Sequence, residues 1–338
     1  MKNKTYIIAE VGPNHLGSVL LAKQYIKVLS KSGVDAVKFQ IGIPEEHYSL
    51  DSFFPKYQKK RYPKGFKLFD VVKKRLLKLK EHKVLYQECK KYKIDYLCSA
   101  FDLKSLKYLN ENFKLKYFKI PSSEILSIDQ IDYISKAKKD IILSTGMAKE
   151  LEIEYAVNRI RKYSKNKIIL LHCVSSYPTE IKDVNLNYLR KLKEKFNCEV
   201  GFSDHSKNNL SAVIAVSLGA KIIEKHVTFD KNLDGPDHLA SLEIKDLKNF
   251  VKSIRETEII LGKSEKILST NEIGVKKSLR KSCVASKNLK KDKILSKGDF
   301  VIKRPGTGIS PILIDKFVGK KIKINIKKDR LIKRSYFD

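Results

Sequence analysis

The stretch EKHVTFDKNLDGPDH (224–238) gathers carboxylate and imidazole side chains around one turn. From Asp230 onward, the residues DKNLDG fit the first half of the calcium-binding EF-hand loop, in which oxygen ligands alternate before a glycine. That loop also needs a bidentate Glu at its twelfth position, where this chain has Ser241. A strand-like run ending in His226 takes the place of the helix that would precede an EF-hand. The turn is therefore not predicted to bind calcium, and another role is expected for its charged residues.

Polar groups also follow other strand-like runs. Eight short, apolar runs cover residues 6–10, 35–40, 95–100, 116–122, 140–145, 168–173, 199–204 and 221–226. Longer amphipathic segments such as VLLAKQYIKVLSKSG separate them, which is the pattern of a parallel sheet covered by helices. Such units, repeated through residues 1–262, predict an α/β fold of the closed (β/α)₈ TIM-barrel type. A doubly wound open sheet is the alternative, although no glycine-rich dinucleotide turn follows the first run.

The carboxyl ends of the strands carry the chemistry of a TIM barrel, so their polar side chains should meet in one mouth. His205 and His226 end neighbouring strands and could share one divalent cation, with coordination positions left open for substrate oxygens. Each could instead be a hydrogen-bonded core histidine. Three carboxylates of the same mouth, Glu10, Glu124 and Asp237, could handle protons or metal-bound water.

Two lysines of this mouth allow several functions. Lys38 and Lys119 could donate to a phosphate or carboxylate, or one of them could form a Schiff base as in class I aldolases. Either could also extend from the barrel rim into solvent. Small hydroxyl donors at four strand ends favour an anion cradle over a Schiff base, namely Ser99, Ser122, Ser144 and Ser203.

The composition limits the partners and the compartment. The net charge of +32 would suit nucleic acid, but the lysines are spread over nearly every amphipathic segment and no nucleic-acid motif accompanies them, so no nucleic acid partner is expected. No apolar run approaches the ~18 residues of a membrane span, and Met1–Thr5 leads directly into a strand, so a cytoplasmic protein without a membrane partner is expected. The five scattered cysteines are expected to be buried apolar residues.

The C-terminal part has a different pattern. A weakly patterned stretch, residues 263–278, is predicted to be a linker. Beyond it, NLKKDKIL (288–295) is echoed by NIKKDRLI (325–332) when Lys and Arg, and Ile and Leu, are treated as equivalent. Two similar β-turn-β pieces predict a small pseudo-symmetric β-rich domain over residues 279–338. A domain of that size buries little apolar surface alone and is expected to dock on something.

In their order and spacing, the motifs resemble those of the sialic acid synthase family. IIAEVGPNHLG resembles the opening motif of that family, and later strands are matched by VKFQ, FKIPSSE, LSTGM, GFSDHS and EKHVTFDKNLDGPDH. The family's C-terminal antifreeze-like (SAF) domain is matched by KSCVASKNLKKDKIL, VIKRPGTGISP and FVGKKI. The resemblance covers essentially the whole chain.

This resemblance implies a transferase that condenses phosphoenolpyruvate with the open-chain aldehyde of an N-acylated mannosamine-type sugar and releases phosphate by C–O cleavage. The expected product is N-acetylneuraminate. The alternative is N,N'-diacetyllegionaminate, made from a 2,4-diacetamido-6-deoxymannose acceptor, and the GPDH motif favours either product over pseudaminate. A Schiff-base aldolase and a non-enzymatic carbohydrate- or nucleic-acid-binding protein are the remaining alternatives.

The resemblance also implies a role for each motif residue. His205 and His226 would bind Mn²⁺ or Mg²⁺, with Glu10 near the metal-bound water. The phosphate and carboxylate would be held by Lys38, Ser99, Lys119, Ser122, Ser144, Ser175 and Ser203. The sugar would face Gln40, Glu124, Tyr177 and Asp237. Arg304 of the KRPG motif would reach the sugar's N-acyl group from the SAF domain of a partner subunit, so a domain-swapped homodimer is expected.

Some positions depart from the family pattern. Ser123 replaces the glycine of the usual P-S-G-E, C-S-A-F (98–101) replaces S-T-P-F, and Asn208 replaces a glycine often found after the SDH motif. A side chain at Ser123 could crowd the substrate where the family has only backbone. No residue among 55–70 corresponds clearly to the asparagine that sialic acid synthases use on the sugar.

Overall fold

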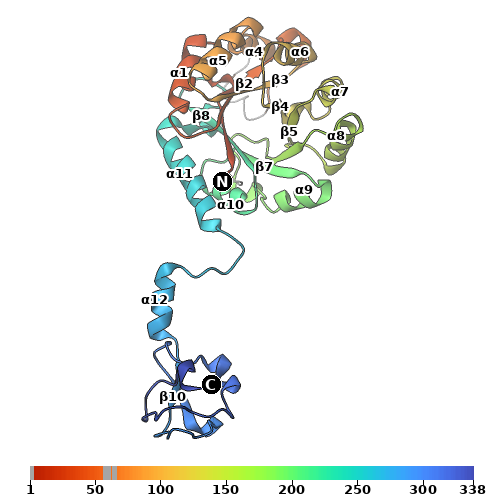
Figure 1. Ribbon diagram of the computed structural model, residues 1–338. Coiled ribbons are helices and arrows are strands. Elements are labelled where there is room, and N and C mark those ends of the chain that lie inside the picture. Colours follow the sequence, from red (N-terminus) through yellow and green to blue (C-terminus); the bar gives the residue numbers. More distant parts are fainter. Residues whose placement is uncertain (1–3, 56–61, 63–66) are drawn as a thin grey trace. The chain divides into compact units, whose positions relative to one another are not determined.

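All eight predicted apolar runs form parallel strands of one closed sheet (Figure 1). The strands are β1 (Tyr6–Glu10), β2 (Ala36–Ile41), β3 (Asp95–Ala100), β4 (Tyr117–Ile120), β5 (Asp140–Ser144), β6 (Ile168–His172), β7 (Glu199–Asp204) and β8 (Ile222–Thr228). Each pairs with the next along the chain, and β1 also pairs with β8. The predicted TIM barrel is confirmed, and the open doubly wound sheet is wrong because it would leave β1 and β8 unpaired with each other.

The computed structural model describes residues 4–55, 62 and 67–338. The chain divides into two compact units, Met1–Gly262 and Lys263–Asp338. Within the described residues, no helix is both long and apolar enough to cross a membrane. All five cysteines are free and buried, as expected of small apolar core residues.

Helices surround the closed sheet (Figure 1). They are α1 (Val19–Leu29), α2 (Pro44–His47), α4 (Leu68–Arg75), α5 (Leu79–Lys91), α6 (Leu103–Asn112), α7 (Ile128–Lys136), α8 (Glu150–Tyr163), α9 (Tyr188–Phe196), α10 (Leu210–Ser217) and α11 (Ile244–Leu261). Helix α1 shows why they form: Ser18 caps its first turn, and it buries Ala22, Tyr25, Ile26 and Leu29, one face at helical spacing.

The inside of the barrel is divided into an apolar layer and a polar layer. Alternate strand residues point inward, and the apolar ones fill the interior; they are Ile8, Ala36, Leu97, Ile142, Ile169, Leu171 and Ile222. Each fully buried aliphatic side chain stabilises the fold by roughly 1.5–3 kcal/mol. The inward positions nearer the carboxyl ends of the strands are polar. The barrel interior is therefore a packed apolar core toward the amino ends and a polar site at the carboxyl ends.

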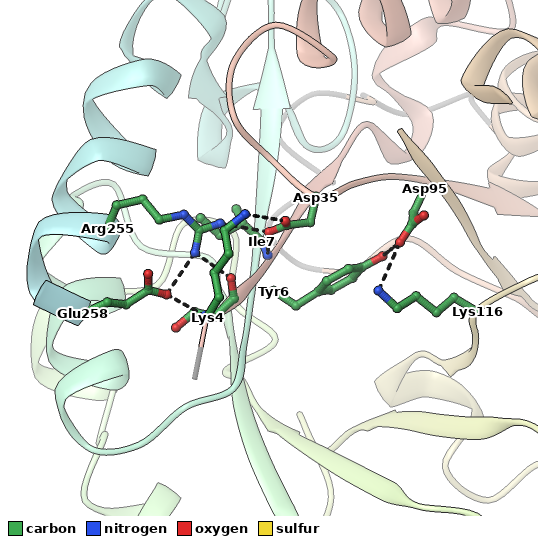
Figure 2. A network of polar contacts seen from close by, with 9 residues as sticks. Lys4, Tyr6, Ile7, Asp35, Asp95, Lys116, Arg255 and Glu258 are labelled. Carbon is green, nitrogen blue, oxygen red and sulfur yellow. Dashed lines mark hydrogen bonds and ion pairs between the residues drawn. The ribbon is translucent and has the colours of Figure 1, made fainter. Parts of the chain in front are cut away.

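Polar contacts tie the start of β1 to α11, the last helix of the barrel, at the amino end of the barrel (Figure 2). Arg255 of α11 donates to Asp35 Oδ2 at 2.9 Å, to the carbonyl of Thr5 at 2.8 Å and to Glu258 Oε1 at 2.9 Å. Asp35 Oδ2 also accepts from the backbone N–H of Ile7 at 2.9 Å. Three segments distant in sequence therefore meet at one guanidinium.

A second group of contacts lies beside this one (Figure 2). The Tyr6 hydroxyl donates to Asp95 Oδ2 at 2.6 Å, and Lys116 Nζ lies 3.3 Å from the same oxygen. Burial, together with the bond to Asp95, raises the pKa of Tyr6, so the phenol keeps its proton and remains a donor. The Tyr6 ring packs edge-on against Tyr117 with a centroid distance of 5.6 Å, beneath the apolar layer.

The weakly patterned stretch that was predicted to be a linker, residues 263–278, overlaps a helix, α12 (Thr270–Leu279). Ser269 and Glu272 form a capping box, in which each side chain accepts from the other residue's backbone N–H. The helix buries none of its residues within the structure, which explains why it has no amphipathic pattern.

The C-terminal unit has the predicted pseudo-symmetry. Strands β10 (Ser282–Ala285) and β11 (Phe300–Lys303) pair antiparallel. The two echoed segments pair with each other, because Leu289 and Ile326 exchange backbone hydrogen bonds of 2.8 Å. Asn288 Oδ1 accepts from the N–H of Lys328 at 2.9 Å, and Asn325 Oδ1 accepts from the N–H of Lys291 at 2.8 Å. Each copy of the motif thus caps the turn of the other.

Replacing Arg255 by Leu should lower the free energy of unfolding of the barrel by about 2 kcal/mol, because it removes charge-assisted hydrogen bonds from partly buried acceptors. The chain has no tryptophan, so urea denaturation would be followed by circular dichroism. Lys252→Ala in the same helix is the control, since Lys252 and Glu256 are both mostly exposed and their pair should contribute less than about 0.5 kcal/mol. Equal losses in the two variants would contradict the role given to the network.

Candidate active site

A cavity of about 720 Å³ opens at the carboxyl ends of the barrel strands. This volume lies within the roughly 300–1,000 Å³ typical of small-molecule sites. The residues predicted from sequence that line it are Glu10, Lys38, Gln40, Ser99, Lys119, Ser122, Ser144, Ser175, Tyr177, Ser203, His205, His226 and Asp237. The structure therefore brings most of the predicted site together.

Strand alternation explains why these side chains share one cavity. Lys38 and Gln40 stand two residues apart on β2, and Glu224 and His226 stand two apart on β8, so each pair points the same way. Lys225, between the last two, does not line the cavity and instead pairs with Asp204 at 2.8 Å. A shift of one residue in the register of β8 would exchange these faces.

Two lysines and two glutamates form a buried charge cluster on the floor of the cavity. Lys38 Nζ lies 3.0 Å from Glu10 Oε2 and 3.5 Å from Glu224 Oε2, and Lys119 Nζ lies 3.7 Å from Glu224 Oε1. Ser203 adds a hydrogen bond to Glu224 Oε1 at 2.9 Å. When Glu10 is ionised, two positive and two negative groups balance one another, which buried ions require.

The pKa values follow from burial and from this pairing. Burial acts to lower the pKa of Lys38, but the carboxylates of Glu10 and Glu224 raise it to about 12. Burial acts to raise the pKa of Glu224, but Lys119 and Lys38 hold it at about 2. Burial raises the pKa of Glu10 to about 7, and burial lowers the pKa of Lys119 against the attraction of Glu224. Lys38 therefore stays cationic, which suits an anion ligand better than a Schiff base.

Serine hydroxyls surround the two ammonium groups. Lys38 Nζ donates to Ser99 Oγ at 3.3 Å, and Lys119 Nζ donates to Ser144 Oγ at 2.5 Å. A hydroxyl can donate as well as accept, so these serines could turn their O–H groups toward an anion held by the lysines.

A close backbone approach completes this side of the cavity at Gly146. Its N–H donates to Ser122 Oγ at 2.9 Å, and a Cβ added to it would lie 2.4 Å from Ser175 Oγ and 2.8 Å from Ser122 Oγ. Cys173 Sγ lies 3.2 Å from the same Ser122 hydroxyl. Only glycine leaves room for both serines at this point of the LSTGM motif.

The two histidines lie side by side, with ring centroids 5.5 Å apart. His205 Nδ1 carries its proton and donates to the carbonyl of Val174 at 2.7 Å, so Nε2 keeps the lone pair that a metal needs. Burial lowers the pKa of His205 to about 4, and burial together with His205 lowers the pKa of His226 well below its usual value. Both imidazoles are therefore neutral near pH 7.

This pair fits a divalent cation. His226 Nδ1 is buried without a hydrogen bond and lies 3.6 Å from Asp237 Oδ2. Among the residues that the structure describes, no three His, Cys, Asp or Glu side chains group as a metal site, so the chain offers two imidazoles rather than a closed cage. Two imidazole ligands would leave positions for water and substrate, as a catalytic metal requires.

The DKNLDG turn leads into Asp237, which lines the cavity. His238 Nδ1 bonds Thr228 Oγ1 at 2.8 Å, and a Cβ on Gly235 would lie 2.5 Å from the His238 ring. Arg75 of α4 binds the carbonyl of Asp234 at 3.0 Å and its carboxylate at 3.2 Å. Burial raises the pKa of Asp237 to about 6.

Two predicted residues are not brought into the cavity lining. Glu124 is buried beside it, where its carboxylate accepts from Ser127 Oγ at 2.5 Å and from Gln130 Nε2 at 3.1 Å. Arg304 belongs to the C-terminal unit, where it is exposed and donates to the carbonyl of Leu279 at 3.0 Å. Most of the range 55–70, in which an acceptor asparagine was sought, lies outside the described residues.

Sequence reasoning missed part of the lining. Glu224 was visible as a strand-end carboxylate but received no role, although it bridges both lysines. The α4 side of the cavity carries no motif, and it contributes Val71, Val72, Arg75 and Leu76. Of the departures from the family pattern, Ser123 lines the cavity, whereas Asn208 Oδ1 accepts from the backbone N–H of Ser211 at 3.2 Å.

Known proteins are similar to this chain over nearly its whole length. The NeuB family pattern matches residues 25–266, and the SAF domain pattern matches residues 280–336. An N,N'-diacetyllegionaminic acid synthase of Campylobacter jejuni is 43% identical over 332 residues, covering 98% of this chain and 99% of that protein. Another from Legionella pneumophila is 37% identical over 325 residues, covering 95% and 91%.

One solved structure is also similar to this chain. The crystal structure of the N-acetylneuraminic acid synthetase of Leptospira borgpetersenii, in complex with citrate, is 34% identical to this chain, with a TM-score of 0.70. The match covers 82% of this chain and 93% of the synthetase chain. The chain belongs to the NeuB family and carries a SAF domain at its C-terminal end.

Proposed function

We propose that this chain is a nonulosonic acid synthase, a transferase that condenses phosphoenolpyruvate with the open-chain aldehyde of an N-acylated mannosamine-type sugar. C3 of phosphoenolpyruvate forms the new bond to the aldehyde carbon. A water oxygen adds to C2. The bond between C2 and the oxygen that carries the phosphoryl group then breaks, and inorganic phosphate leaves with that oxygen. The observation that carries the proposal is the buried cluster of lysines and serine hydroxyls beside two neutral imidazoles, in one cavity.

The lysines and serines would bind phosphoenolpyruvate. Its phosphate and carboxylate need cationic and hydroxyl donors, and Lys38 and Lys119 are the two lysines of the cavity lining as the structure describes it. The hydroxyl donors would be Ser99, Ser122, Ser144, Ser175 and Ser203. Both lysines and Ser99, Ser144 and Ser203 are buried, so water competes little for their hydrogen bonds, whereas Ser122 and Ser175 are half-buried.

His205 and His226 would hold Mn²⁺ or Mg²⁺, which when bound would polarise the aldehyde oxygen as a Lewis acid. Glu10 would accept or return a proton beside them. Gln40 donates to Glu10 Oε1 at 3.0 Å, which fixes that carboxylate in the cavity. Asp237 and Tyr177 would meet the acceptor sugar, Tyr177 from a ring centroid 4.2 Å from that of His205.

Two further residues complete the proposal. Glu124 would act near the sugar end of the site, with its carboxylate oriented by Ser127 and Gln130. Arg304 would bind the sugar's N-acyl group from the SAF domain of a partner subunit in a domain-swapped homodimer. Its exposed side chain in the C-terminal unit leaves it available for such a contact.

The acceptor is better described by the alternative than by the product expected first. The relatives that align over nearly the whole chain at 43% and 37% identity are N,N'-diacetyllegionaminic acid synthases, against 34% for the N-acetylneuraminic acid synthetase structure. We therefore propose 2,4-diacetamido-2,4,6-trideoxymannose as the acceptor and N,N'-diacetyllegionaminate as the product, rather than N-acetylneuraminate.

Incubation with phosphoenolpyruvate, Mn²⁺ and either 2,4-diacetamido-2,4,6-trideoxymannose or N-acetylmannosamine should release phosphate, faster with the diacetamido sugar. Chelation of the metal should stop the release, and borohydride with pyruvate should label neither Lys38 nor Lys119. If no acylated sugar supported phosphate release, the proposal would be contradicted. Borohydride labelling with activity that survives chelation would indicate a Schiff-base aldolase instead.

Replacing His205 or His226 by Ala should weaken Mn²⁺ binding by more than about 100-fold, because loss of a ligand should cost more than the 10–100-fold typical of second-layer changes. Electron paramagnetic resonance of free Mn²⁺ would measure the affinity. His47→Ala removes an imidazole outside the cavity lining and is the control for folding. If both cavity variants bound Mn²⁺ as tightly as the parent, the two histidines would not be the ligands.

Replacing Asp237 by Asn should raise the KM for the acceptor about tenfold or more, since hydrogen bonds to a charged group contribute about 1.5–3 kcal/mol. The affinity for Mn²⁺ should change much less, because Asp237 is assigned to the sugar. Asp230→Asn in the same turn controls for changes in turn geometry. A larger loss of Mn²⁺ affinity than of acceptor KM would assign Asp237 to the metal.

A further inference from the structure

One side of the cavity is apolar, and it is built by helix α4 and the residue that follows it. Val71, Val72 and Leu76 line the cavity there, and Phe101 lines it from the end of β3. A Cβ on Gly42 would lie 3.5 Å from Phe101 Cβ and 3.7 Å from Leu76 Cδ1, so both side chains lie close to Gly42, just beyond the end of β2. We call Val71, Val72, Leu76 and Phe101 the α4 wall.

The α4 wall is held in place by the one charged residue that this helix adds to the lining. Arg75 directs its guanidinium at Asp234, with contacts of 3.0 and 3.2 Å, and lies 5.6 Å from the ring centroid of Tyr62. A Cβ on Gly235 would lie 2.9 Å from Arg75 Nη1. The helix is therefore fastened to the turn that carries Asp237, and its guanidinium is engaged there.

The distribution of charge fixes how an acceptor must lie. The lysines, glutamates and histidines of the cavity all stand at strand ends, so the reacting aldehyde belongs with them. The far end of the sugar must then extend toward groups that take no part in the reaction. A hydroxyl placed against valine, leucine and phenylalanine loses water without gaining a partner, whereas a methyl group gains by leaving water.

We infer that the α4 wall selects an acceptor whose end remote from the aldehyde is a methyl group, a 6-deoxy acetamido sugar, over one that carries a 6-hydroxyl. The inference rests on the proposed function and adds to it the residues that choose the acceptor. Discrimination of this kind in an apolar pocket typically amounts to about 10–200-fold.

The test uses two acceptors that differ only at C6, N-acetylmannosamine and its 6-deoxy analogue. The parent enzyme should prefer the 6-deoxy sugar by about tenfold or more in kcat/KM. Val71→Thr and Val72→Thr keep the side-chain shape and add a hydroxyl, so each should reduce that preference by about tenfold. The KM for phosphoenolpyruvate and the affinity for Mn²⁺ should stay unchanged, because the α4 wall contains none of the residues assigned to phosphoenolpyruvate or to the metal.

Two control variants separate polarity from helix stability and packing. Lys74→Thr puts the same β-branched residue on the exposed face of α4 and should leave the preference as in the parent. Leu76→Met keeps an apolar side chain of similar volume and should also leave it unchanged. A parent that uses both sugars equally, or threonine variants with the parental preference, would overturn the inference. Absence of phosphate release with both sugars and with the diacetamido sugar would instead overturn the proposed function.

Discussion

The structure depends on the mutual neutralisation of four buried charges. Lys38, Glu10, Glu224 and Lys119 come from four strands, and each would be costly to bury without the others. Glu10 and Glu224 stand on β1 and β8, the strands that only ring closure brings together. The closed barrel is thus a condition for the charge cluster, and the cluster is a condition for any anion site on its floor.

The two ends of the barrel carry different tasks. At the amino end, Arg255 joins α11 to the residue before β1 and to the residue before β2, close to where β1 pairs with β8. At the carboxyl end the same strands present inward charges to a cavity. This separation allows the site to keep desolvated groups, such as the neutral His205 and His226 pair, while other contacts stabilise the barrel.

The sequence predicted most of the strands and the floor of the site, because a period of two and strand-end position determine which residues face inward. It could not predict the α4 wall, since Val71 and Val72 carry no chemistry of their own and reach the cavity only through helix placement. Glu124 shows a similar limit: a short 3₁₀ turn directs its carboxylate to Ser127 rather than into the lining. The strand-end motifs resemble those of the sialic acid synthase family as a whole, so the sequence left N-acetylneuraminate and N,N'-diacetyllegionaminate as alternative products.

The reciprocal caps of the C-terminal unit constrain how that unit can form. Asn325 caps the turn at Lys291 across 34 residues, and Asn288 caps the turn at Lys328 across 40. Neither copy of the motif is complete until the other has been synthesised and has closed the intervening loop. Because each cap joins one copy of the motif to the other, the two caps favour cooperative folding of the SAF domain, in which both copies become stable together.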